Sequence, residues 1–432
     1  MAKRKTCSVF SSNDFNAHLG KSNQAQYLIR YLNDLGAQTC VLEEEYIDKD
    51  YLVDYQKFYS RSFGGNGKFT KRMHFFKEEF SYEDFTNLLK KGDKKSLEDA
   101  QYLGFVVIRP IKDEKDQPFI GRTLLETYQV KVDGDERHYV ISNFNVSLFG
   151  ITLQVKSLPF QAQDEGVSAC ATIALWSALQ HLGKKFGTPR YAPAEITEIA
   201  TSLPQVSRLF PSAGLYWGQM INGVRSLGLD IEVIKPKEDN ITTAVKAYIN
   251  AGFPIIAALT LKKNSLTRRH AAVISGYRCD KNENLKELYV HDDRIGPFSK
   301  AEPKGSFQNW KNEWNKEEYG GYSVDLEKLL IPIYHKMRLT FSRIYTFYQE
   351  AKNTQIDRRP NWDLRLYLFS VQKYKEFLLG ESIKGKEKIL AKSLPRFLWV
   401  IRGYDKSKSK FDAVYDGTSI YTRKKIVLIE FI

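Results

Sequence analysis

One stretch constrains the fold of this chain more than any other, the run of small and apolar residues between positions 170 and 182. The apolar side chains recur at helical spacing, at Ala171, Leu175, Ala178, Leu179 and Leu182. This period predicts a buried helix, and Ser168 is a suitable N-cap that places Cys170 in the first turn. The unpaired N–H groups and helix dipole there favour a thiolate. Cys170 is therefore a candidate nucleophile, although free cysteines also serve as small buried residues.

A histidine and an aspartate downstream complete a candidate catalytic set. His270 opens an apolar strand pattern at 270–277, where an imidazole facing the cysteine helix would act as general base. The next strand, 287–292, ends in Asp292, whose carboxylate would orient that imidazole. Each residue alone also suits an ordinary structural role, in the core or in a turn. Together, the order Cys, His, Asp indicates nucleophilic catalysis.

The periodicity elsewhere predicts an α+β protein in three parts. After the cysteine helix it predicts two helices, a strand, a helix and three strands, at 193–203, 215–227, 231–234, 240–251, 255–261, 270–277 and 287–292. Helices packed on one side of an antiparallel sheet give an α+β core. We expect this core at 151–330, between an accessory α+β region at 1–150 and a basic α+β region at 331–432. The last region either stands alone or completes a sheet begun before residue 150.

These residues and their contexts resemble the papain-like cysteine peptidases, most closely the branch that includes the bacteriocin-processing, double-glycine leader peptidases. The match comprises the helix from Cys170 to Leu182-Gly183, the pattern His-Ala-x-Val-x-x-Gly-Tyr at 270–277, the strand end Val290-His291-Asp292, and a helix-to-strand unit at 224–234. It covers about residues 151–300. The resemblance implies a papain-like core and a cysteine peptidase or isopeptidase. Such an enzyme cleaves a peptide or protein amide through a thioester on Cys170, with His270 and Asp292, and needs no cofactor or metal.

The chain departs from the family pattern where an oxyanion-binding glutamine is expected. The family has this glutamine six residues before the cysteine, where this chain has Asp164, and the nearest glutamine is Gln163. The resemblance implies that Gln163 and the backbone N–H of Cys170 bind the oxyanion, provided that one loop residue bulges out. The displaced glutamine also leaves open a non-catalytic or regulatory binding protein on the same scaffold. A transglutaminase-like acyltransferase would share the thioester.

Charge is concentrated at the C-terminal end. The formal net charge is +14, and residues 331–432 contain 21 basic and 10 acidic side chains. This region predicts a docking surface for an acidic partner, either a nucleic acid or a protein, or else a solvated basic face. Earlier in the chain, Arg109 and Arg122 in apolar strand patterns predict buried ion pairs or snorkelling side chains, with ligand binding as the alternative. Tyr216 and Trp217, beside glycines, either wall a substrate pocket or pack in the core.

Cysteine spacing and hydropathy exclude several classes of protein. The four cysteines lie far apart with no CxxC pair, which argues against a disulfide framework and a structural zinc site. No uncharged run reaches the roughly 18 residues of a membrane span, and no signal-peptide core is present. We therefore expect a cytoplasmic protein without a membrane span. The oligomeric state has no signature in the sequence.

Overall fold

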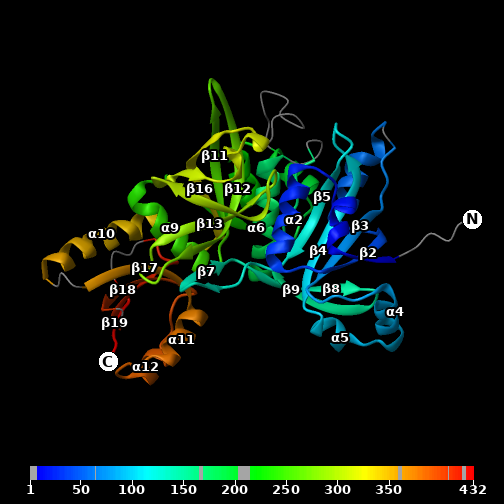
Figure 1. Ribbon diagram of the computed structural model, residues 1–432. Helices are drawn as coiled ribbons and strands as arrows, with labels where there is room; N and C mark the ends of the chain where they lie inside the picture. Colours follow the sequence, from blue (N-terminus) through cyan, green and yellow to red (C-terminus); the bar gives the residue numbers. More distant parts are fainter. Residues whose placement is uncertain are drawn as a thin grey trace, which may run out of the picture.

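The computed structural model describes residues 7–63, 65–164, 169–202, 215–358, 362–406, 408–420 and 425–432. Within these residues, the strands form three antiparallel sheets and one two-stranded hairpin, combined with helices (Figure 1). The predicted α+β class with antiparallel sheets is confirmed. Among the described residues, no helix combines the length and the apolar character needed to cross a bilayer.

The first sheet has five strands in chain order. They are β1 (Cys7–Ser11), β2 (Thr39–Tyr46), β3 (Thr70–Phe76), β4 (Tyr102–Lys112) and β5 (Pro118–Leu125). Two helices accompany it, α1 (Phe15–Leu19) and α2 (Asn23–Leu35). Helix α2 ends at Leu35, and its C-cap Gly36 adopts a left-handed φ of 78°.

Side chains alternate between the two faces of this first sheet, as strand geometry requires. On one face, Cys40, Leu42 and Phe75 pack with α2 and the centre of the molecule. On the other face, Val41 and Phe76 pack against α4 (Tyr82–Lys91), α5 (Lys94–Asp99) and the hairpin of β8 (Ser142–Leu148) and β9 (Ile151–Ser157). The sheet therefore joins a second apolar cluster to the central core. The short helix α3 (Lys49–Lys57) lies between β2 and β3 in the chain.

The second sheet contains a closed barrel of six strands. These are β11 (Ile255–Lys263), β12 (Leu266–Cys279), β13 (Leu285–Asp292), β14 (Gly296–Lys304), β15 (Ser306–Lys311) and β16 (Ser323–Tyr334). Each pairs with the next, and β11 also pairs with β16, which closes the circle. Three further strands extend the sheet: β10 (Leu229–Ile234) beside β16, and β7 (Asp135–Tyr139) with β6 (Lys131–Val132) beside β12.

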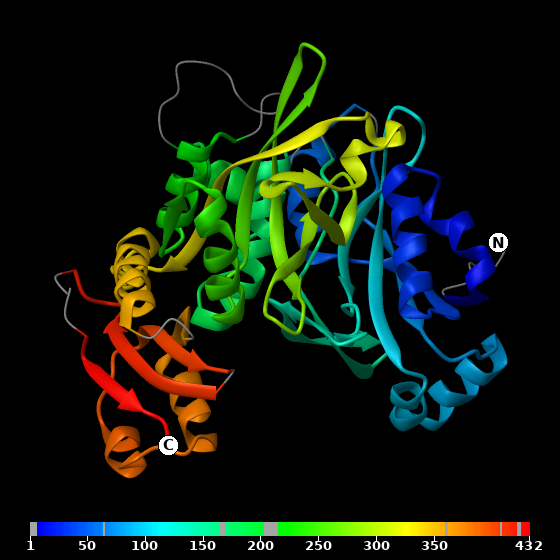
Figure 2. The ribbon, with the colours of Figure 1, turned by 60° about the vertical axis from the view of Figure 1, so that its left-hand side comes forward.

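Four helices accompany the barrel in the predicted order. They are α6 (Cys170–Phe186), α7 (Pro193–Ala200), α8 (Trp217–Ser226) and α9 (Glu238–Asn250). Figures 1 and 2 show α6 between the five-stranded sheet and the barrel strands. Strands β14 to β16 are absent from the sequence prediction. The predicted boundary at 150 falls in the β8–β9 turn and the one at 330 falls inside β16.

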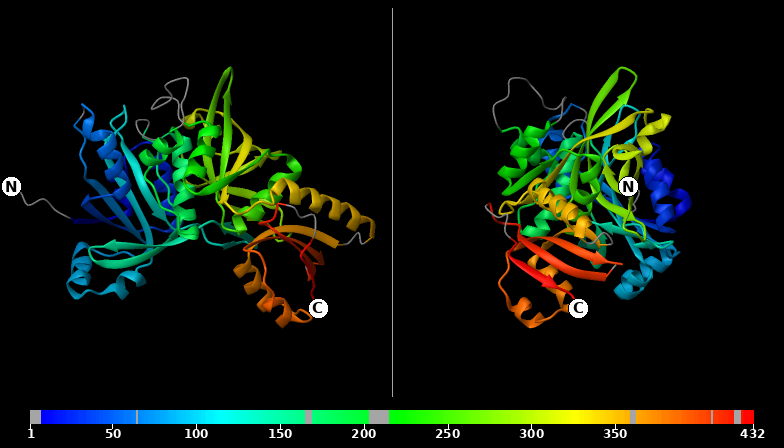
Figure 3. Two further views of the ribbon diagram at one scale, coloured as in Figure 1. Left: turned by 180° about the vertical axis from the view of Figure 1, so that it is seen from behind. Right: turned by 90° about the vertical axis from the view of Figure 1, so that its left-hand side faces the viewer.

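The C-terminal residues form their own sheet, so the interpretation in which they complete an earlier sheet is wrong. The sheet has the order β17 (Trp362–Ser370), β18 (Phe397–Asp405), β19 (Lys408–Asp416) and β20 (Val427–Glu430). It is accompanied by α10 (Phe341–Arg358), α11 (Val371–Gly380) and α12 (Lys386–Ala391). Strand β16 ends at Tyr334, and α10 begins seven residues later, at Phe341. Figure 3 shows this unit at the end of the molecule away from the five-stranded sheet.

Candidate active site

Helix α6 places Cys170 at its first residue, in agreement with the predicted position in the first turn. The N-cap position is occupied by Ala169, and the predicted cap Ser168 lies outside the described residues. The side chains from Ala171 to Gly183 are buried, whereas Cys170 is half-buried. Backbone N–H groups in the first turn of a helix have no acceptor within it. The Cys170 side chain therefore lies beside the N–H groups of the first turn, at the positive end of a buried helix.

His270 lies where β12 enters the core. Residues 266–269 are exposed, and from His270 onward the strand is mostly buried. The imidazole Nε2 donates to Asp292 Oδ2 at 2.9 Å, and the ring also hydrogen-bonds to the Cys170 side chain. Because Asp292 occupies Nε2, Nδ1 is the nitrogen left for Cys170. The structure thus brings together the three predicted side chains in the order sulfur, imidazole, carboxylate.

The electrostatic surroundings favour a charged imidazole. Burial alone lowers the pKa of His270, but the charge and hydrogen bond of Asp292, together with the bond to Cys170, raise it well above its ordinary value. Asp292 responds in the opposite direction. Burial raises its pKa, but His270 and further donors outweigh burial, so the net shift is downward. The pair is therefore held as imidazolium and carboxylate.

Two further donors hold the Asp292 carboxylate in place. Trp314 Nε1 donates to Oδ2 at 2.8 Å, and the Arg294 backbone N–H donates to Oδ1 at 3.0 Å. The Trp314 ring also packs edge-on against the His270 ring, with the centroids 5.2 Å apart. Trp314 belongs to a short 3₁₀ helix, Glu313–Asn315, between β15 and β16. Trp314 was not among the predicted site residues, since nothing in the sequence near 313–315 links it to Asp292.

We expect Trp314→Phe to lower the free energy of unfolding at pH 7 by about 1.5–3 kcal/mol, because a hydrogen bond to a charged carboxylate is lost. The folded-state pKa of Asp292 should then rise, since Trp314 helps to lower it. Stability from a lowered carboxyl pKa is present above the unfolded pKa and is lost as the pH falls through the folded one. The decrease in the free energy of unfolding caused by Trp314→Phe should therefore become smaller towards pH 3.

Trp310→Phe is the matched control for urea unfolding at both pH values. Trp310 Nε1 donates to the neutral backbone carbonyl of Phe307 at 2.8 Å, so its loss should cost the same at pH 7 and pH 3. If the cost of Trp314→Phe were as independent of pH as that of Trp310→Phe, Trp314 would not stabilise the charged form of Asp292.

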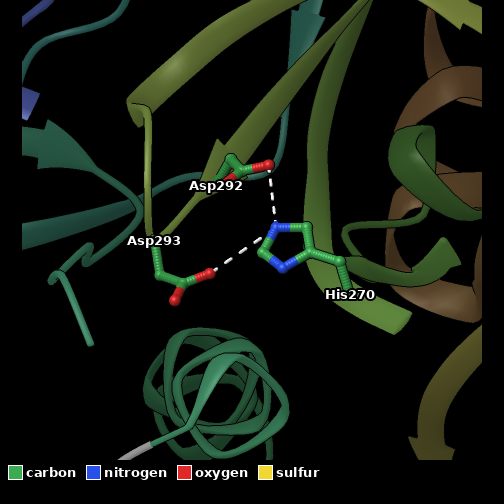
Figure 4. Close-up of side chains that lie close together, drawn as sticks. All are labelled: His270, Asp292 and Asp293. Carbon is green, nitrogen blue, oxygen red and sulfur yellow. Dashed lines mark hydrogen bonds and ion pairs between the residues drawn. The ribbon is translucent and has the colours of Figure 1, made fainter. Parts of the chain in front are cut away.

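A second carboxylate, Asp293, faces the imidazole from another side. Its Oδ1 lies 3.7 Å from His270 Nε2, and Figure 4 draws this contact together with the one between His270 and Asp292. Asp293 is 2% exposed, and neither carboxylate oxygen has a hydrogen-bond partner among the described residues. Burial raises the pKa of Asp293 to about 7, against the opposing charge of His270. Asp293 therefore changes its charge near neutral pH, next to the candidate base.

His270, Asp292 and Asp293 also form a set that could hold a metal ion, with one ligand atom from each lying within 4.8 Å of the others. The hydrogen bonds argue against that use. Asp292 Oδ2 already accepts from His270 and Trp314, and Oδ1 accepts from Arg294. A metal would have to displace the His270 N–H and compete with two fixed donors for the same carboxylate. The contacts fit a hydrogen-bonded triad better than a metal centre.

The predicted oxyanion side chain, Gln163, makes no hydrogen bond to the triad within the described part of the chain. Gln163 is buried, but no hydrogen bond joins it to Cys170 or His270 among the residues the structure describes. Asp164, at the position of the family glutamine, is paired with Arg109 at 2.9 Å, and both side chains are fully buried. The predicted buried ion pair of Arg109 is thereby confirmed. A role for Gln163 in binding the oxyanion stays a prediction.

Arg109 fixes more of the segment that leads to Cys170. Its Nη2 donates to Gln161 Oε1 at 2.7 Å, while the Gln161 amide nitrogen is buried without a partner among the described residues.

Tyr216 and Trp217 at the start of α8 are 47% and 52% exposed, so the prediction that they pack in the core is wrong for both. Their use as pocket walls stays a prediction.

Comparison of the chain with family models and with curated proteins finds no match. Its function must therefore be inferred from the contacts of Cys170, His270 and Asp292.

Proposed function

We propose that this protein is a cysteine peptidase or isopeptidase with a papain-like core, acting through Cys170, His270 and Asp292. One observation carries the proposal: the His270 ring is hydrogen-bonded to the Cys170 side chain and, through Nε2, to Asp292. A nucleophile, a base in contact with it and a carboxylate that orients the base are the parts that acyl transfer needs. The helix followed by consecutive antiparallel strands, which carries the three residues, also supports this fold.

In the first half of the reaction, His270 holds the proton of Cys170 and the thiolate attacks the carbonyl carbon of the scissile amide. A C–S bond forms and the carbonyl π electrons move to oxygen. When the tetrahedral intermediate collapses, the C–N bond breaks and the imidazolium gives its proton to the leaving amine. The products of this half are a free amine and a thioester on Cys170.

In the second half, water attacks the thioester and His270 accepts its proton. The C–S bond breaks, a carboxylic acid leaves, and the proton returns to the sulfur, so the enzyme is regenerated. The oxyanion of both halves is stabilised by the backbone N–H of Cys170, which lies at the first residue of its helix and so has no acceptor within that helix. Gln163 is proposed as the second donor. If an amine took the place of water, the product would be a new amide, the outcome of a transglutaminase-like acyltransferase.

Thiol alkylation tests the proposal without knowledge of the substrate. At pH 7, iodoacetamide should modify Cys170 at least about tenfold faster than Cys7, Cys40 or Cys279. Burial raises the pKa of Cys7 and of Cys279 to about 11 and that of Cys40 well above its usual value, whereas Cys170 is half-buried and bonded to His270. Mass spectrometry of tryptic peptides over time gives the four rates.

His270→Phe supplies the control, because it should slow the alkylation of Cys170 and leave the other three cysteines unchanged. Equal slow labelling of all four cysteines in the wild type would overturn the proposal of a peptidase and favour a non-catalytic binding protein.

A second experiment identifies the products. A peptide library is incubated with the wild type, with and without EDTA, and with the Cys170→Ala variant. Cleavage that persists in EDTA and disappears in Cys170→Ala supports hydrolysis by the cysteine, whereas new amides indicate acyl transfer.

A further inference from the structure

A cavity of about 620 Å³ lies near the other end of α6 from Cys170. It is lined by β7, the later turns of α6, the end of α9 and the first turn of α11, elements that Figure 1 shows near one another. Lys185 of α6 lines it, and the rise of a helix places this residue about 22 Å along the axis from Cys170. The cavity is therefore separate from the candidate active site. Its volume is in the range of small-molecule sites.

Three cations from three elements surround this cavity. Arg137 of β7, Lys185 of α6 and Lys373 of α11 line it, and Glu136 is the one carboxylate among the described lining residues. Arg137 donates to the Tyr289 hydroxyl and to a backbone carbonyl, and Lys185 donates to the Ala251 carbonyl, all of them neutral acceptors. Among the described residues, none of the three cations is paired with a carboxylate. This differs from Arg109 or Arg402, each of which has a buried aspartate.

The two lysines repel one another. Burial and, to a smaller extent, the charge of Lys373 together lower the pKa of Lys185 to about 8. Both lysines also help burial to lower the pKa of His181 to about 4, and the His181 ring is already bonded to Ser142 and the Gly252 carbonyl. An anion between Lys185 and Lys373 would relieve this repulsion. No hydrogen bond from the Lys373 ammonium is formed within the described part of the chain, so its three donors can serve such a ligand.

We propose that this cavity binds a small anion that bears a phosphate group, held by Lys373, Lys185 and Arg137. A phosphate carries nearly two negative charges and several acceptor oxygens, so it can meet donors that arrive from three directions. A carboxylate has a single charge and two oxygens in one plane, which suits one such donor better than three. The site does not depend on the proposed peptidase activity, since none of its residues contacts the triad.

Isothermal titration calorimetry of the full chain at low ionic strength tests this site, with inorganic phosphate, pyrophosphate and AMP as separate probes. At least one probe should bind one-to-one, and Lys373→Ala should weaken that binding about tenfold or more. Lys373 is exposed on α11, so its replacement leaves the fold intact. Lys375→Ala is the matched control, because Lys375 lies on the same helix and bonds to the carbonyls of Leu390 and Lys392 outside the cavity.

Binding that is weakened by Lys373→Ala and unchanged by Lys375→Ala supports the site, and the probe that binds best gives the ligand class. The proposal is overturned if none of the three probes binds at millimolar concentration. It is also overturned if Lys373→Ala and Lys375→Ala weaken binding by the same factor, because the binding would then come from a diffuse basic surface. Cys170 alkylation of the same samples shows separately whether the triad is intact.

Discussion

Asp292→Asn is expected to lower the rate of peptide hydrolysis on the order of 10³-fold while the protein remains folded. The carboxylate accepts from His270 and Trp314 at Oδ2 and from the Arg294 N–H at Oδ1. An asparagine amide offers one oxygen and one NH₂ group. Whichever way the amide turns, its NH₂ group meets a fixed N–H donor, so only a carboxylate satisfies all three bonds.

Both orientations of the new amide impair the base. With its nitrogen towards His270, the ring must leave Nε2 bare and carry its proton on Nδ1, the nitrogen needed to accept the proton of Cys170. With its oxygen towards His270, the Arg294 N–H loses its acceptor, and the negative charge that supports the imidazolium is gone. The measurement is the hydrolysis rate of a peptide that the wild type cleaves, with circular dichroism as a check on folding. A folded variant that loses less than about tenfold would remove Asp292 from the mechanism.

Asp293→Asn is the matched comparison, because it removes the neighbouring carboxylate without touching the hydrogen bonds of Asp292. Burial raises the pKa of Asp293 to about 7, so above pH 7 its charge supports the His270 imidazolium, and well below pH 7 it is protonated. In the variant, the alkaline limb of the pH–rate profile should therefore move to lower pH, while the rate near pH 6 changes little. An unmoved alkaline limb would show that Asp293 does not act on His270.

The three triad residues could be predicted because each lies at the end of an element with a clear local pattern. The period of the apolar residues after Cys170 and the alternation after His270 mark a helix start and a strand. The strand that ends at Asp292 is likewise visible as a short apolar run. The order of elements from α6 to β13 then follows from patterns of the same kind.

The strands that close the barrel were missed for a physical reason. β14 contains Pro297 and Pro303, and β16 contains Pro332, which pairs with Ile231 of β10. Prolines within an apolar run argue against a strand, because they cannot donate to a ladder. Trp314 lies between these missed strands, so its bond to Asp292 depends on barrel closure and has no local signature. The role of Asp164 was missed because its partner, Arg109, lies on β4, 55 residues earlier in the chain.

Replacement of Arg109, the partner of Asp164, has the largest expected effect on the stability of the protein. Arg109→Met should lower the free energy of unfolding at pH 7 by about 3–5 kcal/mol, because the buried Asp164 carboxylate loses its counter-charge. Asp54 lies 3.8 Å from the Arg109 guanidinium, but its loss of this contact adds less to the destabilisation. Burial raises the pKa of Asp54 to about 8, so its carboxyl group is mostly protonated and uncharged at pH 7. Urea unfolding of the wild type and the variant measures the difference.

Two further variants separate the buried charge from the loss of packing. Adding Asp164→Asn to Arg109→Met should recover about 1–3 kcal/mol, because the buried negative charge is removed and a neutral amide remains. Arg122→Met, on the neighbouring strand β5 and with no ion pair among the described residues, should cost less than about 1 kcal/mol. If Arg109→Met lowered the free energy of unfolding no more than Arg122→Met does, this account of the buried charge would be contradicted.

Arg109 also donates to Gln161, which precedes Cys170 in the chain. Arg109→Met should therefore loosen the position of Gln161 and slow the alkylation of Cys170, even under conditions where the variant is fully folded.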